Sequence, residues 1–170
     1  MRIEALADAD SVARAGAALT AVEARAAVAA RERFIVAFSG GHTPWQMLRA
    51  LADEDMPWAG VHVVQVDERV APAGDPDRNL THLRESLLAH CPLPPEQLHA
   101  MPVESGDLET ASAQYARALQ RIAGSPAVLD LPIWALGPTA IPLHWCPVMR
   151  CSMSPAQTWR SPVSIRGGAG

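Results

Sequence analysis

The sequence lacks several features that would place it in a familiar functional class. It contains no lysine, so all 14 basic residues are arginines, and its formal net charge of −4 argues against a general nucleic-acid-binding surface. Its three cysteines show neither metal-site spacing with histidine nor a disulfide framework. No apolar run reaches the roughly 18 residues that a membrane-spanning helix needs. We therefore expect a cytoplasmic protein that binds neither nucleic acid nor membrane.

Acidic residues are missing from the last part of the chain. All 18 of them lie at or before Asp130, whereas residues 132–170 hold six prolines and three of the five tryptophans. Prolines at such short intervals exclude a long helix or a central strand. The sequence therefore predicts part of a single domain over residues 1–131 and an irregular tail over residues 132–170.

Before Asp130, apolar runs alternate with amphipathic segments. The continuous apolar runs at 34–38 and 61–66 predict buried parallel strands that are covered on both faces. The alternation predicts an α/β fold, a Rossmann-like arrangement of three layers around a parallel sheet, truncated after about the third or fourth strand. Ligands of such sheets bind beyond the carboxyl ends of the strands. Helices are predicted over 8–33 (one helix or a pair), 44–52, 79–90 and 107–122, and short strands over 98–103 and 128–131.

A glycine turn follows the first predicted strand. Ser39-Gly40-Gly41 ends the strand, and a helix can start near Thr43-Pro44. Unpaired backbone N–H groups at a helix N-terminus attract anions, and glycines let a phosphate approach the backbone closely. The pattern is neither a P-loop nor a dinucleotide-binding fingerprint. A plain strand-to-helix connector fits such a turn equally well, so the turn alone leaves the function open.

Two carboxylates and a guanidinium follow the second predicted strand as Asp67-Glu68-Arg69. Arginine presents a planar fork that suits phosphate, and a carboxylate beside it can act as a base or orient a sugar. The alternative is a solvated loop with a local ion pair. Asn79 opens the next predicted helix, where it either caps the helix or contacts a phosphate or sugar.

Taken together, these motifs resemble the 6-phosphogluconolactonase family, within the larger group that includes glucosamine-6-phosphate isomerases. The resemblance spans roughly residues 1–131. It implies hydrolysis of 6-phospho-gluconolactone to 6-phosphogluconate without metal or cofactor, and we expect a monomer. The matching residues are Ser39-Gly40-Gly41-His42-Thr43-Pro44, Trp58, Asp67-Glu68-Arg69-Val70, Asp75-Pro76-Asp77-Arg78-Asn79 and Ala113-Gln114-Tyr115.

The resemblance also implies roles for individual residues. Asp67 and Arg69 would be catalytic. Two alternatives stay open: a sugar-phosphate isomerase or deaminase, whose branch usually has tyrosine after the Asp-Glu pair, and a non-catalytic sugar-phosphate-binding module. The residues expected to hold the substrate phosphate are Ser39, Gly40, Gly41, Thr43, Arg69 and Asn79.

One family motif is missing. Members carry Gly-x-Gly-x-Asp-Gly-His-Thr-Ala-Ser-Leu after the next strand, and its histidine is the general base. Codons compatible with residues 133–147, read one nucleotide earlier, permit His-Leu-Gly-Leu-Gly-Pro-Asp-Gly-His-Thr-Ala-Ser-Leu-Val-Pro. The sequence therefore predicts that residues 132–170 are an out-of-frame tail, that His144 is not the catalytic histidine, and that the chain as written is inactive.

Overall fold

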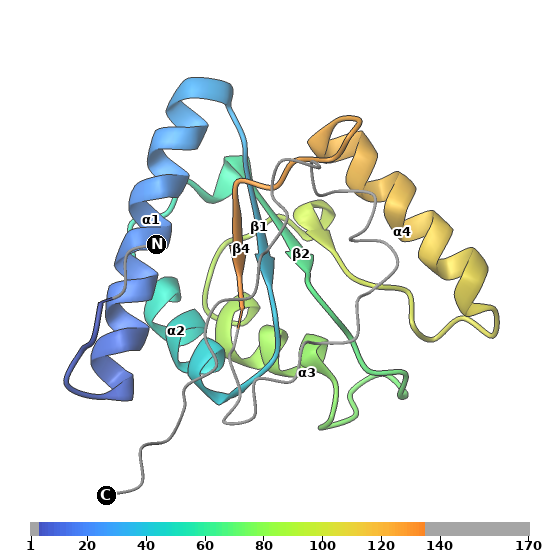
Figure 1. The fold of residues 1–170 in the computed structure, drawn as a ribbon, viewed down its shortest axis with the longest axis horizontal. Coiled ribbons are helices and arrows are strands. Elements are labelled where there is room, and N and C mark those ends of the chain that lie inside the picture. The colour runs from blue at the N-terminus through green and yellow to red at the C-terminus, as the bar shows by residue number, and fades with distance from the viewer. Residues whose placement is uncertain (1–3, 135–170) are drawn as a thin grey trace, which may run out of the picture.

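The computed structural model describes residues 4–134, which form a parallel sheet between two layers of helices (Figure 1). The sheet has the strand order β3-β2-β1-β4, and every pairing is parallel. This arrangement confirms the predicted α/β fold with a parallel sheet. The strands are β1 (Phe34–Phe38), β2 (Val61–Gln65), β3 (Leu98–His99) and β4 (Leu131–Ile133).

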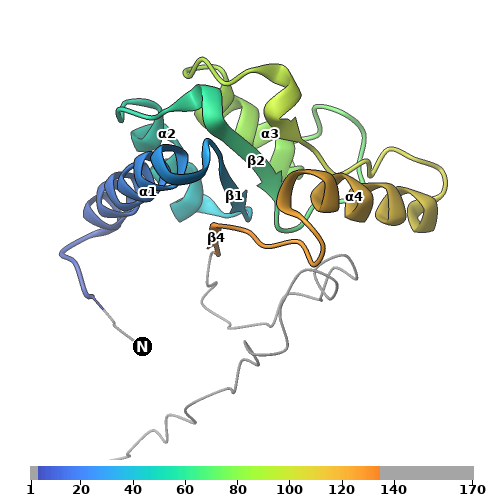
Figure 2. The same ribbon diagram turned by 90° about the horizontal axis from the view of Figure 1, so that it is seen from above.

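The helices lie on both faces of the sheet, as the view from above shows (Figure 2). The first predicted helical segment is one continuous helix rather than a pair. Asp8 caps its start by accepting the Ser11 N–H, and the helix ends before Glu32, whose backbone φ is 60°. The helices are α1 (Ala9–Arg31), α2 (His42–Ala52), α3 (Asn79–Leu83), which continues into a π-helical turn over Arg84–Leu88, and α4 (Leu108–Ala123). Helix α4 packs on the face of the sheet opposite to α1, α2 and α3.

Strand β1 is apolar throughout because both of its faces are covered. Phe34, Val36 and Phe38 belong to the core beneath α1, α2 and α3. Ile35 and Ala37 belong to a second core beneath α4. Alternate side chains of a strand point to opposite faces, so an uninterrupted apolar run is what a doubly covered strand requires. This burial fixes β1, and with it the glycine turn that follows.

Strand β4 is fastened to β1 by Asp130. Its carboxylate accepts hydrogen bonds from the Ile35 N–H at 2.8 Å and from Arg31 at 2.6 Å, and its own N–H donates to the Ile35 carbonyl. The strand begins at Leu131, three residues later than predicted, and includes Pro132. Proline is tolerated there because β4 is an edge strand of the described sheet. Residues 135–170 of the predicted out-of-frame tail lie outside the described residues.

Two histidines face each other near the amino-terminal end of β2. His62 Nδ1 lies 3.1 Å from His99 Nε2, and both side chains are half-buried. Burial lowers the pKa of His62, and Arg33 lowers it further. Burial also lowers the pKa of His99, with smaller contributions from His62 and Arg121.

These lowered pKa values predict that the folded chain loses stability in acid. Below the ordinary histidine pKa of 6.5, the unfolded chain takes up protons that folded His62 and His99 do not. The free energy of unfolding should therefore fall as the pH drops below 6.5 and level off below the folded-state pKa values. Urea denaturation on either side of that pH measures the effect. The double variant His62→Gln/His99→Gln should depend less on pH, and an unchanged dependence would contradict the assignment.

Among the helices of residues 4–134, none combines the length and the apolarity that crossing a membrane requires.

Candidate functional site

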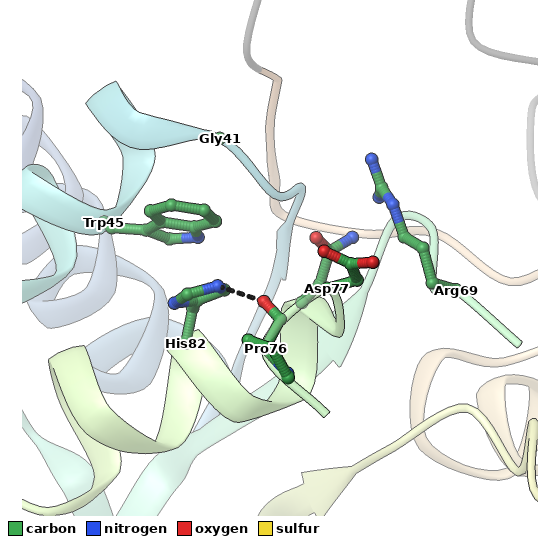
Figure 3. A pocket seen from close by; sticks show the side chains of 7 residues that line it. Gly41, Trp45, Arg69, Pro76, Asp77 and His82 are labelled. Atoms are coloured by element: carbon green, nitrogen blue, oxygen red, sulfur yellow. Dashed lines mark hydrogen bonds between the residues drawn. The ribbon is translucent and has the colours of Figure 1, made fainter. Parts of the chain in front are cut away.

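A pocket lies where the loops after β1 and β2 meet, at the carboxyl ends of the strands (Figure 3). Its volume is about 370 Å³. Three residues that the sequence predicts as phosphate ligands line it: Gly41, Arg69 and Asn79. Trp45 and His82 stand on one side and Arg69 on the other. The full lining is Gly41, Trp45, Arg69, Pro76, Asp77, Asn79 and His82.

The two glycines of the turn serve different purposes. Gly41 precedes the first residue of α2 with φ 127°, a backbone conformation that side chains disfavour. Gly40 packs against Asn79, since a Cβ on Gly40 would lie 1.9 Å from the Asn79 Oδ1 atom. The turn therefore presents the N-terminus of α2 to the pocket and leaves room for Asn79 beside it.

The other three predicted phosphate ligands, Ser39, Gly40 and Thr43, are not among the residues that line the pocket. Ser39 is buried, and its N–H donates to the Ile133 carbonyl at 3.1 Å, so it joins the turn to β4. Thr43 is exposed in the first turn of α2 and is not among the residues that line the pocket. Their roles as phosphate ligands remain predictions.

Asp67 forms an ion pair with the pocket-lining residue Arg69. Arg69 Nη1 lies 2.6 Å from Asp67 Oδ2, and the Arg69 side chain is 49% exposed. Asp67 Oδ1 is buried and accepts no hydrogen bond from any of the residues in the described part of the chain. Because this oxygen is closed to solvent and Asp67 is not among the pocket-lining residues, Asp67 acts on the pocket through its ion pair with Arg69.

Glu68 differs from its neighbours because its side chain is completely buried. Burial alone raises the pKa of Glu68, but hydrogen bonds from Gln65, Arg69, Leu80 and Asn79 outweigh it and hold the pKa below its ordinary value. Glu68 therefore stays ionised with its oxygens occupied, and it is not the carboxylate that could act as a base beside Arg69.

Arg78 is buried between two carboxylates. It is 2% exposed, its Nε lies 3.4 Å from Glu68 Oε2, and its Nη1 donates to Glu104. Burial lowers the pKa of Arg78, but the hydrogen bond to Glu104 and the charges of Glu68 and Glu104 together raise it. Arg78, and not Asn79, occupies the N-cap position of α3. Sequence reasoning missed this cluster because its members stand 10 and 26 residues apart.

An aromatic pair forms the wall opposite Arg69. The rings of Trp45 and His82 stack with centroids 3.8 Å apart, and His82 Nε2 lies 2.7 Å from the Pro76 carbonyl oxygen. The helical spacing of Trp45 with Leu48 and Leu51 predicts a core-facing side chain. Leu48 and Leu51 are buried, but Trp45 is half-buried and lines the pocket. The sequence pattern cannot separate the pocket-lining Trp45 from the buried Leu48 and Leu51, because all three lie on the same side of the helix.

Comparisons with known proteins agree with this geometry. The family model described as "Glucosamine-6-phosphate isomerases/6-phosphogluconolactonase" matches residues 7–140. A 6-phosphogluconolactonase of Mycobacterium leprae is 34% identical over 145 residues, which cover 80% of this chain and 59% of that protein. The chain thus spans little more than half of this relative.

Solved structures share the fold. The 6-phosphogluconolactonase of Thermotoga maritima matches with a TM-score of 0.69 and 24% identity, over 78% of this chain and 58% of that one. A monomeric glucosamine-6-phosphate deaminase matches with a TM-score of 0.65 and 16% identity, over 76% and 54%. Because a lactonase and a deaminase both match, the fold does not choose between the two activities.

Proposed function

Because the chain belongs to the glucosamine-6-phosphate isomerases/6-phosphogluconolactonase family, we propose that its pocket binds 6-phospho-gluconolactone and serves lactone hydrolysis. The observation that carries the proposal is the meeting of Arg69 with the N-terminus of α2 in one pocket. An arginine fork and unpaired backbone N–H groups both favour a phosphate. The 34% identity to a relative named 6-phosphogluconolactonase supports this branch of the family.

We assign the residues around the pocket to phosphosugar binding and to stabilisation of negative charge. The N–H groups at the start of α2 and the Arg69 guanidinium hold the phosphate or stabilise negative charge in the reaction. Asp67 pairs with Arg69 at 2.6 Å and holds its guanidinium beside the pocket. His82 lines the pocket, but it is held by the Pro76 carbonyl and by the Trp45 ring. We therefore assign residues 4–134 the binding of the phosphosugar and leave the general base to the missing histidine motif.

Removing the arginine should weaken phosphosugar binding. For the purified chain, Arg69→Gln is expected to raise the Kd for 6-phosphogluconate roughly ten- to hundredfold, because a charge-assisted hydrogen bond contributes about 1.5–3 kcal/mol. Isothermal titration calorimetry measures the Kd. Arg49→Gln is the control, since Arg49 is exposed on the same helix as Trp45 and does not line the pocket. Equal affinity in the wild type and Arg69→Gln would refute the phosphate site.

Titrations with two phosphosugars and a lactone-hydrolysis assay test the remaining alternatives. Tighter binding of glucosamine 6-phosphate than of 6-phosphogluconate would favour the isomerase or deaminase branch over the lactonase branch. Binding of 6-phosphogluconate without any acceleration of lactone hydrolysis is the result that the missing histidine motif predicts, and absence of both would refute a phosphosugar-binding module. Measurable lactone hydrolysis by the chain as written would refute its predicted inactivity.

A further inference from the structure

We infer that Glu68 is a positioning residue, which holds the backbone of the Arg69 loop and the start of α3 in the geometry that forms the pocket. The inference rests on the proposed phosphosugar site. Glu68 does not line the pocket, yet it contacts the main chain of two residues that do, Arg69 and Asn79.

The two oxygens of Glu68 join segments that are far apart in sequence. Oε1 accepts the Arg69 N–H and the Asn79 N–H, both at 2.8 Å. Oε2 accepts the Leu80 N–H at 3.0 Å and the Gln65 amide at 3.0 Å. One carboxylate therefore binds the end of β2, the loop behind it and the first turn of α3.

This clamp reaches the glycine turn through Asn79. The Asn79 side chain donates to the Asp67 carbonyl at 3.0 Å and occupies the space above Gly40. A shift of the α3 backbone would move Asn79 relative to both Asp67 and Gly40. The position of Glu68 thus sets the spacing between the turn after β1 and the loop after β2.

The negative charge of Glu68, and not only the position of its two oxygens, is needed to hold these backbone N–H groups. Backbone N–H groups bond more strongly to an ionised carboxylate than to a neutral amide. Glutamine in place of Glu68 would keep one acceptor oxygen and turn an NH₂ group toward donors that already need an acceptor. Arg78 would then keep Glu104 as its other carboxylate partner.

The test compares Glu68→Gln with Glu104→Gln. Each substitution removes one carboxylate from Arg78, but Glu104 is 55% exposed and its carboxylate is bonded to Arg78 rather than to the pocket loops. Binding of 6-phosphogluconate is measured by calorimetry at a temperature where both variants are folded. Glu68→Gln should raise the Kd at least about tenfold, because misplaced binding groups lose much of their effect. Glu104→Gln should leave the Kd within about twofold of the wild type.

Amide resonances of the ligand-free chain give a readout that is independent of phosphosugar binding. In Glu68→Gln, the amide protons of Arg69, Asn79 and Leu80 should move upfield as they lose a charged acceptor, while Glu104→Gln leaves them in place. If Glu68→Gln does not fold, Glu68→Asp takes its place. Aspartate keeps the charge beside Arg78 but is one methylene too short to reach all these donors, so it should also shift the amides and weaken binding.

The amide shifts and the Kd values together decide whether Glu68 has this positioning role. Shifted amides together with weaker binding support the positioning role. Unshifted amides, or equal affinity losses in Glu68→Gln and Glu104→Gln, would overturn it. A wild-type chain that does not bind 6-phosphogluconate would refute the proposed function, and the amide shifts would still report whether Glu68 holds the two loops.

Discussion

Correcting the reading frame by one nucleotide beside the Leu131 codon is expected to raise lactone hydrolysis by roughly 10²–10⁴-fold over the chain as written, which is the contribution of a positioned general base. The corrected frame permits Gly-Pro-Asp-Gly-His-Thr-Ala-Ser-Leu after the fourth strand, with the histidine codon straddling those of Ala140 and Ile141. The value of kcat/KM for 6-phospho-gluconolactone, measured for both chains, checks the prediction.

The control for this experiment is the frame-corrected chain with its motif histidine changed to glutamine. That variant should keep its affinity for 6-phosphogluconate and lose the gain in rate. If it hydrolyses the lactone as fast as the corrected chain, the histidine is not the base. Resequencing the gene is a separate test: codons beside Leu131 that do not encode the motif in the neighbouring frame would show that the out-of-frame hypothesis is wrong.

Most of the described fold could be predicted because its signals are local. The apolar runs predict the bounds of β1 and nearly those of β2. The predicted helix start at Asp107 is also confirmed, since the Asp107 carboxylate caps α4. The start of β4 was predicted too early. Apolar content at Val128 suggested a strand, but that side chain is 62% exposed, and pairing with β1 begins at Leu131.

The site was harder to predict because its geometry depends on contacts between distant residues. Motifs identified Gly41, Arg69 and Asn79, which line one pocket. They could not separate the two carboxylates of Asp67-Glu68, although Asp67 pairs with the pocket residue Arg69 and Glu68 is buried under α3. That difference comes from the hydrogen bonds of Asn79 and Leu80, which belong to the next helix.

A methyl group on Gly40 is expected to damage the pocket more than its small size suggests. The new Cβ would lie 1.9 Å from Asn79 Oδ1 and 2.5 Å from Asn79 Cγ, so the Asn79 side chain must move. Its hydrogen bond to the Asp67 carbonyl would then be lost. Overpacking of this kind costs about 1–3 kcal/mol of stability. Because a displaced binding group costs up to about 10²-fold, Gly40→Ala should raise the Kd for 6-phosphogluconate roughly 10–100-fold.

The control is Gly106→Ala, because a Cβ on Gly106 meets nothing within 4 Å and should change neither stability nor affinity by a measurable amount. A double-mutant cycle then locates the cause. Asn79→Ala removes the side chain that the new methyl group strikes, so the cost in stability of Gly40→Ala should be smaller in that background than in the wild type. Affinity should stay low in the double variant, since Asn79 itself is absent. If the two stability changes simply add, Gly40 is required for some reason other than the space that Asn79 occupies.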